Sequence, residues 1–183
     1  MRILAFPASN SKASINSDLV QYALGRLGKL TQHLDTNVLS LNDFEMPLYS
    51  IDRETEEGIP NSAHHFFKQI GSADVILVSF AEHNGCVSVA WKNIFDWMSR
   101  IQTKVWQGKP LVLLAATPGP RAGGSVLAQQ VALAPHFGAD VKGYLGIGNW
   151  SESWDPGNKQ LLKDNDINRL DELLSTLLPT TRN

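Results

Sequence analysis

The sequence lacks the features by which several classes of protein are recognised. Its 183 residues include a single cysteine, Cys86, so no disulfide bond can form within the chain. With 16 lysines and arginines against 18 aspartates and glutamates, it has no cationic excess for a nucleic-acid backbone. No apolar run approaches the roughly 18 residues that a membrane-spanning helix needs, and the first residues predict a strand rather than a targeting segment. We therefore expect a soluble, cytoplasmic protein with no nucleic-acid partner and no membrane contact.

Two further absences concern chemistry. The histidines lack the spacing to cysteines or paired carboxylates that a metal site requires, and no serine, histidine and aspartate stand in the order of a hydrolase triad. The sequence also has neither the Gly-Lys-Ser/Thr end of a P-loop nor the G-x-G-x-x-G fingerprint of dinucleotide folds. We therefore predict no metal and assign no catalytic residue.

The patterns that are present predict one α/β domain over residues 1–183. Short apolar runs predict strands at residues 3–6, 37–41, 74–80, 110–116 and 141–145. Stripes of helical period predict helices at 15–27, 63–70, 89–101 and 125–137, with a further stripe at 167–177 and a long polar connection at 42–60. Near-continuous apolar strands that alternate with helices are typical of a doubly wound parallel sheet covered on both faces.

Such sheets bind ligands beyond the carboxyl ends of their strands, so the loops after residues 6, 80 and 116 are the candidate site. The first loop offers hydroxyl and amide groups, one lysine and a helix N-terminus, a combination that stabilises an anion. Because it has no glycine, it favours a single terminal phosphate over a pyrophosphate, which needs a close backbone approach. The alternative interpretation of Ser14 is that it only caps the N-terminus of the helix that follows and binds no ligand. The candidate phosphate ligands are Ser9, Ser11, Ser14, Ile15 and Asn16.

Three segments carry the pattern of a known family. Residues 8–16 read Ala-Ser-Asn-Ser-Lys-Ala-Ser-Ile-Asn, residues 81–86 read Ala-Glu-His-Asn-Gly-Cys, and residues 91–97 read Trp-Lys-Asn-Ile-Phe-Asp-Trp. They resemble the Gly-Ser-x-Arg-x-x-Ser-x-Asn loop, the Pro-Glu-Tyr-Asn-Gly-Ser loop and the Leu-Lys-Asn-x-x-Asp-Trp helix of the NADPH-dependent FMN reductase family. Ala8 and Ser11 replace the glycine and the arginine of the first motif.

The resemblance implies a flavodoxin-like three-layer sandwich with a five-stranded parallel sheet that binds FMN. NADPH or NADH would reduce the flavin, which would then reduce a flavin, a quinone or a similar small acceptor. Backbone groups of Glu82, His83, Asn84 and Gly85 would contact the flavin ring, which would also lie beside a third loop that contains Thr117, Pro118, Gly119 and Arg121. For His83 and Arg121, the alternative is an exposed loop residue with no ligand.

The helix at 89–101 also bears on assembly. Its apolar residues exceed what one buried stripe needs, and family members commonly pair such helices, so we expect a homodimer or a dimer of dimers. The apolar residues concerned are Trp91, Ile94, Phe95, Trp97 and Met98. Lys92 and Asp96, four residues apart, are expected to form an ion pair within the helix.

Two other functions stay open at the level of sequence. A non-enzymatic flavin-binding or electron-carrier module would share the fold, although the near-balanced charge argues against steering toward a basic redox partner. A scaffold that binds no nucleotide is suggested by the departures from the family motifs at Ala8, Ser11 and Ala81.

Overall fold

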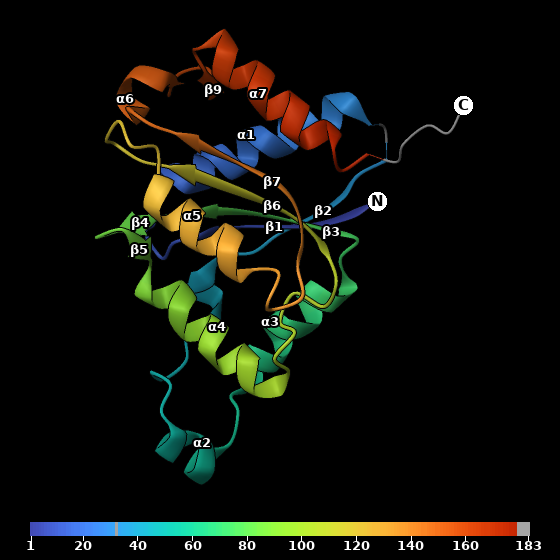
Figure 1. Ribbon diagram of the computed structural model, residues 1–183, viewed down its shortest axis with the longest axis vertical. Helices are drawn as coiled ribbons and strands as arrows, with labels where there is room; N and C mark the ends of the chain where they lie inside the picture. The colour runs from blue at the N-terminus through green and yellow to red at the C-terminus, as the bar shows by residue number, and fades with distance from the viewer. Residues whose placement is uncertain (32, 179–183) are drawn as a thin grey trace.

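A computed structural model describes residues 1–31 and 33–178 (Figure 1). Within them, the core is an all-parallel sheet with the strand order β2-β1-β3-β6-β7. The strands are β1 (Arg2–Ala8), β2 (Asp35–Val38), β3 (Val75–Phe80), β6 (Pro110–Ala116) and β7 (Asp140–Ile147). This confirms the predicted five-stranded parallel sheet.

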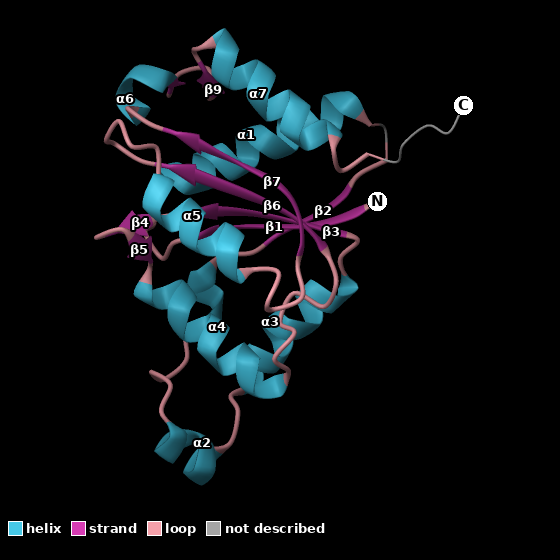
Figure 2. Cartoon of the chain, in the orientation of Figure 1, coloured by secondary structure: helices cyan, strands magenta, loops and turns pink. Residues whose placement is uncertain are grey.

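Helices cover both faces of the sheet and form the three predicted layers (Figures 1 and 2). One face is covered by α1 (Ile15–Leu30) and α7 (Asp164–Ser175), and the other by α3 (Asn61–Ser72), α4 (Val89–Ile101) and α5 (Gly124–Leu133). Helix α1 buries Leu19, Ala23 and Leu27, which are four residues apart and therefore share one side of the helix. The sheet has a hydrophobic core on each side.

Trp91 lies at the centre of the core beneath α4. Its ring centroid lies 5.1 Å from that of Phe6 and 5.7 Å from those of Phe95 and Trp106. Trp97 and Met98, on the same helix, are also buried. The sequence interpretation that the apolar residues of α4 exceed what the chain itself buries is therefore wrong, because the sheet, the neighbouring helices and residues 47–49 cover them and, of the five, only Phe95 is partly exposed.

The region between β1 and β3 also differs from the prediction. The strand expected at 37–41 runs from Asp35 to Val38, because Leu41 and Phe44 turn into the core on a short 3-10 helix, η1 (Leu41–Phe44). The polar connection after it contains α2 (Ile51–Glu57), which Ser50 caps by accepting a hydrogen bond from the Arg53 N–H. Because no residue of α2 is buried, its sequence has no apolar stripe from which a helix could be predicted.

Helix α2 sits on an arm that projects from the body (Figure 2). The arm is attached to α4 at its base, where the Trp97 indole N–H donates to the Pro47 carbonyl at 2.7 Å. Glu54 accepts hydrogen bonds from the Tyr49 hydroxyl at 3.0 Å and from Arg100 Nε at 2.9 Å. Partial desolvation and this contact with Glu54 raise the pKa of Tyr49.

The remaining elements are short. They are β4 (Glu82–His83), β5 (Cys86–Val87), α6 (Trp150–Ser153), β8 (Trp154–Asp155) and β9 (Gln160–Leu161). Trp150 and Trp154 stack with ring centroids 4.8 Å apart and are buried within the chain.

We expect Trp91→Ala to lower the free energy of unfolding by about 3–5 kcal/mol, because it empties the centre of an aromatic core. The measurement is urea unfolding of the ligand-free protein. Leu162→Ala, at a residue that is 53% exposed, serves as the control and should change stability by less than about 0.5 kcal/mol. Equal effects of the two substitutions would contradict this description of the core.

Candidate functional site

The three loops singled out in the sequence leave the sheet at one edge. Ala8 pairs with Phe80, and Phe80 pairs with Ala115, so β1, β3 and β6 end level with one another. The chain leaves β1 toward α1 on one face and leaves β3 toward α4 on the other. Because the two connections diverge, a crevice opens between them, at the switch point where doubly wound sheets bind their ligands.

The side chain of Asn16 joins the two central strands and α1 at this edge. Its Oδ1 accepts hydrogen bonds from the Ala116 N–H at 2.8 Å and the Ser79 hydroxyl at 2.7 Å, and its Nδ2 donates to the Ala116 carbonyl at 3.1 Å. Asn16 and Ser79 are buried. Since the carboxamide is occupied inside the protein, Asn16 offers a ligand only its backbone N–H, which has no partner within the first turn of the helix.

A second buried polar side chain, Ser88, joins α4 to the end of β1. Its hydroxyl donates to the Ala8 carbonyl at 2.9 Å and accepts from the Trp91 N–H at 3.2 Å, which makes it the N-cap of α4. The starting points of α1 and α4 are thus both tied to strand ends by hydrogen bonds. The walls of the crevice are therefore well defined in the ligand-free protein.

The first loop presents hydroxyl groups and a cation toward a cavity of about 320 Å³, lined by Ser9, Ser11, Lys12 and Ser17 together with residues 38–40 and 42–43. Ser9 is buried and its hydroxyl accepts from the Ser11 N–H at 3.2 Å. Ser14 is the N-cap of α1 by position, yet its side chain accepts no hydrogen bond from the first turn. The interpretation of its hydroxyl as a helix cap is therefore wrong. Ser14 and Ile15 lie at the helix start but do not line this cavity.

The second loop forms a tight β-hairpin. Glu82 pairs with Val87 and His83 with Cys86, and the two turn residues have positive φ values, 54° at Asn84 and 80° at Gly85. An Asn-Gly pair is the preferred sequence for such a turn, because asparagine and glycine tolerate this conformation. His83 and Asn84 line a cavity of about 570 Å³ with Asn10 of the first loop and residues of η1 and α4.

The third loop packs on the end of β7. The Thr117 N–H donates to the Ile147 carbonyl at 3.0 Å, and the Gly119 carbonyl accepts from the Asn149 N–H at 3.0 Å. A side chain at Gly148 would come within 2.9 Å of the Gly119 carbonyl, so this close approach requires a glycine. Pro118, Gly119 and Arg121 are exposed, and with Thr117 they line neither of the two cavities above.

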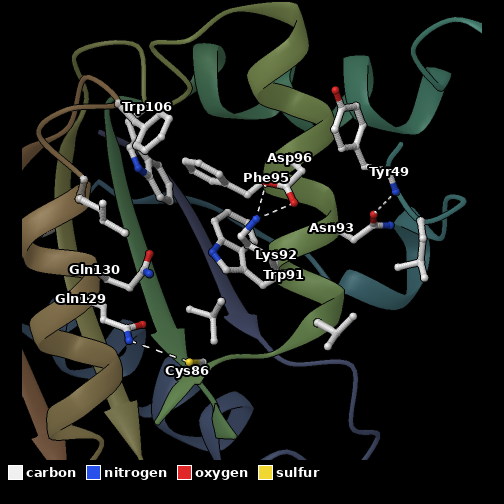
Figure 3. A pocket seen from close by; sticks show the side chains of 16 residues that line it. Tyr49, Cys86, Trp91, Lys92, Asn93, Phe95, Asp96, Trp106, Gln129 and Gln130 are labelled. Carbon is white, nitrogen blue, oxygen red and sulfur yellow. Dashed lines mark hydrogen bonds and ion pairs between the residues drawn. The ribbon is translucent and has the colours of Figure 1, made fainter. Parts of the chain in front are cut away.

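A third, more apolar cavity of about 580 Å³ lies between α4 and α5 (Figure 3). Val89 and Leu133 line it and are 72% and 47% exposed. The ion pair predicted within α4 is confirmed, with 2.7 Å between Lys92 Nζ and Asp96 Oδ2, and it lies at this cavity. Cys86 of the hairpin also lines it.

Some residues that shape the site were absent from the sequence prediction. Ser79 falls inside the predicted strand at 74–80 and Gly148 follows the one predicted at 141–145, where neither stands out as a ligand. Asn10 lies within the serine-rich loop and Asn42 begins the polar connection at 42–60, so their polar amide side chains are a usable signal for a binding site. Among residues 1–31 and 33–178, no group of three or more histidine, cysteine, aspartate or glutamate side chains is placed to hold a metal ion, and no helix is long and apolar enough to cross a membrane.

The strand order and the three-loop crevice define a flavodoxin-like α/β protein. The chain belongs to the NADPH-dependent FMN reductase family, whose sequence model matches residues 1–152. It is 33% identical to a quinone reductase of Escherichia coli over 75 residues (41% of this chain, 40% of that protein). It is 30% identical to an NAD(P)H-dependent FMN reductase of Pseudomonas aeruginosa over 121 residues (65% and 61%). The chain thus spans less than two thirds of the length of these curated relatives.

Solved structures show the same fold at low sequence identity. A flavoenzyme NAD(P)H:acceptor oxidoreductase of Paracoccus denitrificans superimposes with a TM-score of 0.72 at 20% identity, over 96% of this chain and 94% of that one. An FMN-dependent NADH-azoreductase of Bacillus anthracis, solved in complex with FMN, gives a TM-score of 0.70 at 13% identity, over 97% and 99%. The predicted fold and family are therefore confirmed.

We expect Asn16→Ala to lower the free energy of unfolding by about 3 kcal/mol, because it leaves buried polar groups of Ala116 and Ser79 without partners at ~1–3 kcal/mol each. The measurement is denaturant unfolding of the ligand-free protein. Asn168→Ala, on the exposed side of α7, is the matched control and should be nearly neutral. Asn16→Ala with parental stability would contradict the role assigned to the carboxamide.

Proposed function

We propose that this protein is an NAD(P)H-dependent oxidoreductase that holds FMN in the crevice between the three loops and reduces a flavin, a quinone or a similar small molecule. One observation supports this above the others. At the switch point of the sheet, the serine-rich start of α1 lies on one side of the crevice and the Asn-Gly hairpin lies on the other. The chain that forms this crevice is a member of the FMN reductase family. The protein would act in the cytoplasm.

The residues present fit a phosphate and a flat ring. The Ser14 hydroxyl makes no capping bond, the first-turn N–H groups of Ile15 and Asn16 have no helical partner, and Lys12 supplies a positive charge nearby. We propose that these groups, with Ser9 and Ser11, bind the phosphate of FMN.

The ring would lie between the hairpin and the third loop. The proposed contacts are Glu82, His83, Asn84 and Gly85 on one side and Thr117, Pro118, Gly119 and Arg121 on the other. FMN, when bound, supplies the hydride chemistry between the nicotinamide and the acceptor. The chain's own contribution is to bind, orient and shield, so no side chain has to act as an acid or base in the hydride step. This is consistent with the absence of an assigned catalytic residue.

The test is a titration of the purified protein with FMN, followed by steady-state assays with NADPH and NADH against quinone, flavin and azo-dye acceptors. FMN binding together with NAD(P)H oxidation is the expected result. FMN binding without NAD(P)H oxidation would indicate an electron carrier, and no FMN binding would indicate a scaffold. Either of these two outcomes refutes the proposal.

The phosphate site yields a gain-of-affinity prediction at Ser11, which is exposed and lines the first-loop cavity. Ser11→Arg should tighten FMN binding by about tenfold at low salt, or ~1.4 kcal/mol, because it adds a charge-assisted hydrogen bond to the phosphate. The gain should shrink at high salt as the charges are screened. Affinity is measured by fluorescence titration.

The control for Ser11→Arg adds the same charge far from the loop. Asn168→Arg, on the exposed side of α7, should leave FMN affinity unchanged at both salt concentrations. If Ser11→Arg binds FMN no more tightly than the parent at low salt, the phosphate is not held by this loop.

We further propose that the protein forms a homodimer, or a dimer of dimers, through the apolar cavity between α4 and α5. Support comes from exposed apolar residues on two neighbouring parts of the molecule. Val89 and Leu133 line the cavity, while Leu48 and Ile51 lie 62% and 59% exposed at the start of the projecting arm. Association of two copies would bury these residues, whereas a monomer leaves them in water.

Light scattering at micromolar concentration should therefore give a multiple of the monomer mass, and Leu133→Glu should shift the protein toward the monomer by placing a charge in the interface. Leu162→Glu introduces the same change at another exposed leucine and should not alter the mass. A monomer mass for the parent protein across this range would exclude the proposed assembly.

A further inference from the structure

Helix α5 begins without a cap of its own. Its N-cap residue is Gly123, at a φ of 69° and with no side chain to accept a hydrogen bond from the first turn. A Cβ atom at this position would lie 2.5 Å from the Cβ of Ala115, so the usual capping residues serine, threonine, aspartate and asparagine do not fit. The Gly124 N–H donates to the Arg121 carbonyl at 2.9 Å, so the next two N–H groups of α5, those of Ser125 and Val126, need a partner from elsewhere.

Glu82 supplies that partner from the hairpin. Its Oε2 accepts a hydrogen bond from the Val126 N–H at 3.0 Å, across 44 residues of sequence. Val126 is the third residue of α5, which is the position that a local N-cap side chain would normally serve. The carboxylate also lies at the positive end of the helix dipole, which favours its negative charge. Because Glu82 is partly buried, solvent screens this contact only in part.

The rest of the hairpin packs against the same end of α5. A Cβ built on Gly85 lies 3.6 Å from the Cβ of Ser125, a normal van der Waals distance, so turn and helix are in contact. On the next turn of the helix, Gln129 Nε2 lies 3.9 Å from the Cys86 sulfur. Of these contacts, the one from Glu82 is a charge-assisted hydrogen bond and is the strongest.

We propose that the side chain of Glu82 is a positioning residue: it clamps the hairpin at 82–87 to the start of α5, and so sets the distance between the second and third loops. The resemblance to the FMN reductases assigned Glu82 a backbone contact with the ring, and the side chain has a separate task. The clamp rests on the proposed function only for the identity of the ligand between the two loops. The loops themselves are joined in the ligand-free protein.

The experiment compares the parent with three variants. In Glu82→Ala the acceptor is lost, in Glu82→Gln a neutral acceptor of the same length remains, and Glu172→Ala removes an exposed glutamate from α7 as the control. FMN affinity of the ligand-free proteins is measured by fluorescence titration. We expect Glu82→Ala to bind FMN about tenfold more weakly and Glu82→Gln to stay within about threefold of the parent. The control should bind as the parent does.

Hydrogen exchange at the Val126 amide tests the clamp without any ligand. In Glu82→Ala this amide should exchange about tenfold faster than in the parent, while Glu82→Gln and Glu172→Ala should keep its protection. Should Glu82→Ala fail to fold, Glu82→Asp takes its place, because its carboxylate is one methylene too short to reach Val126 from the present position of β4.

The outcomes separate the clamp from the proposed function. If the parent does not bind FMN, the proposed function fails, and Val126 exchange alone decides on the clamp. Unchanged Val126 exchange in Glu82→Ala overturns the clamp. If Val126 loses protection while FMN affinity stays at the parental value, the hydrogen bond exists but does not position the site, which also overturns the proposal. Equal loss of affinity in Glu82→Ala and Glu82→Gln would show that charge, and not the hydrogen bond, is responsible, and this too would overturn the proposal.

Discussion

The carboxamide of Asn16 pairs with both backbone polar groups of Ala116 and accepts a hydrogen bond from the Ser79 hydroxyl, so that α1, β3 and β6 meet at one buried point. The first wall of the crevice depends on this contact. It sets where α1 begins, and hence where the first-turn N–H groups lie. Unpaired polar groups at this depth are costly, so the arrangement has few alternatives.

The second wall of the crevice is held less deeply. The hairpin leaves β3, is tied to α5 through Glu82, and is followed by Ser88, which anchors α4 to Ala8. The third loop rests on β7, where Gly148 permits the backbone of Gly119 to approach. Each loop is thus fixed by an element that is distant in sequence. A flat ligand between the hairpin and the third loop would enter a site whose separation is set before it binds, which lowers the ordering cost of binding.

Much of this molecule could be predicted from the sequence. The apolar runs of β1, β3, β6 and β7 and the stripes of α1, α4 and α7 depend on local periodicity, and each is found at or near its predicted place. The family follows from short motifs whose spacing is kept. Helix α2 could not be predicted because it buries no residue. The early end of β2 could not be predicted either, because Leu41 and Phe44 enter the core from a 3-10 helix, and their apolar pattern resembles that of a strand.

Local pattern therefore determined the alternation of strands and helices, the parallel sheet and the three loops at its edge, because periodicity and turn chemistry act between near neighbours. Tertiary structure alone decided the direction of the polar side chains. Four apolar residues of α4 proved to be core, Asn16 turned inward, Ser14 kept its hydroxyl free of the helix, and Glu82 capped a helix 44 residues away. Such choices depend on which donors and acceptors folding brings together, and those partners are far apart in the sequence.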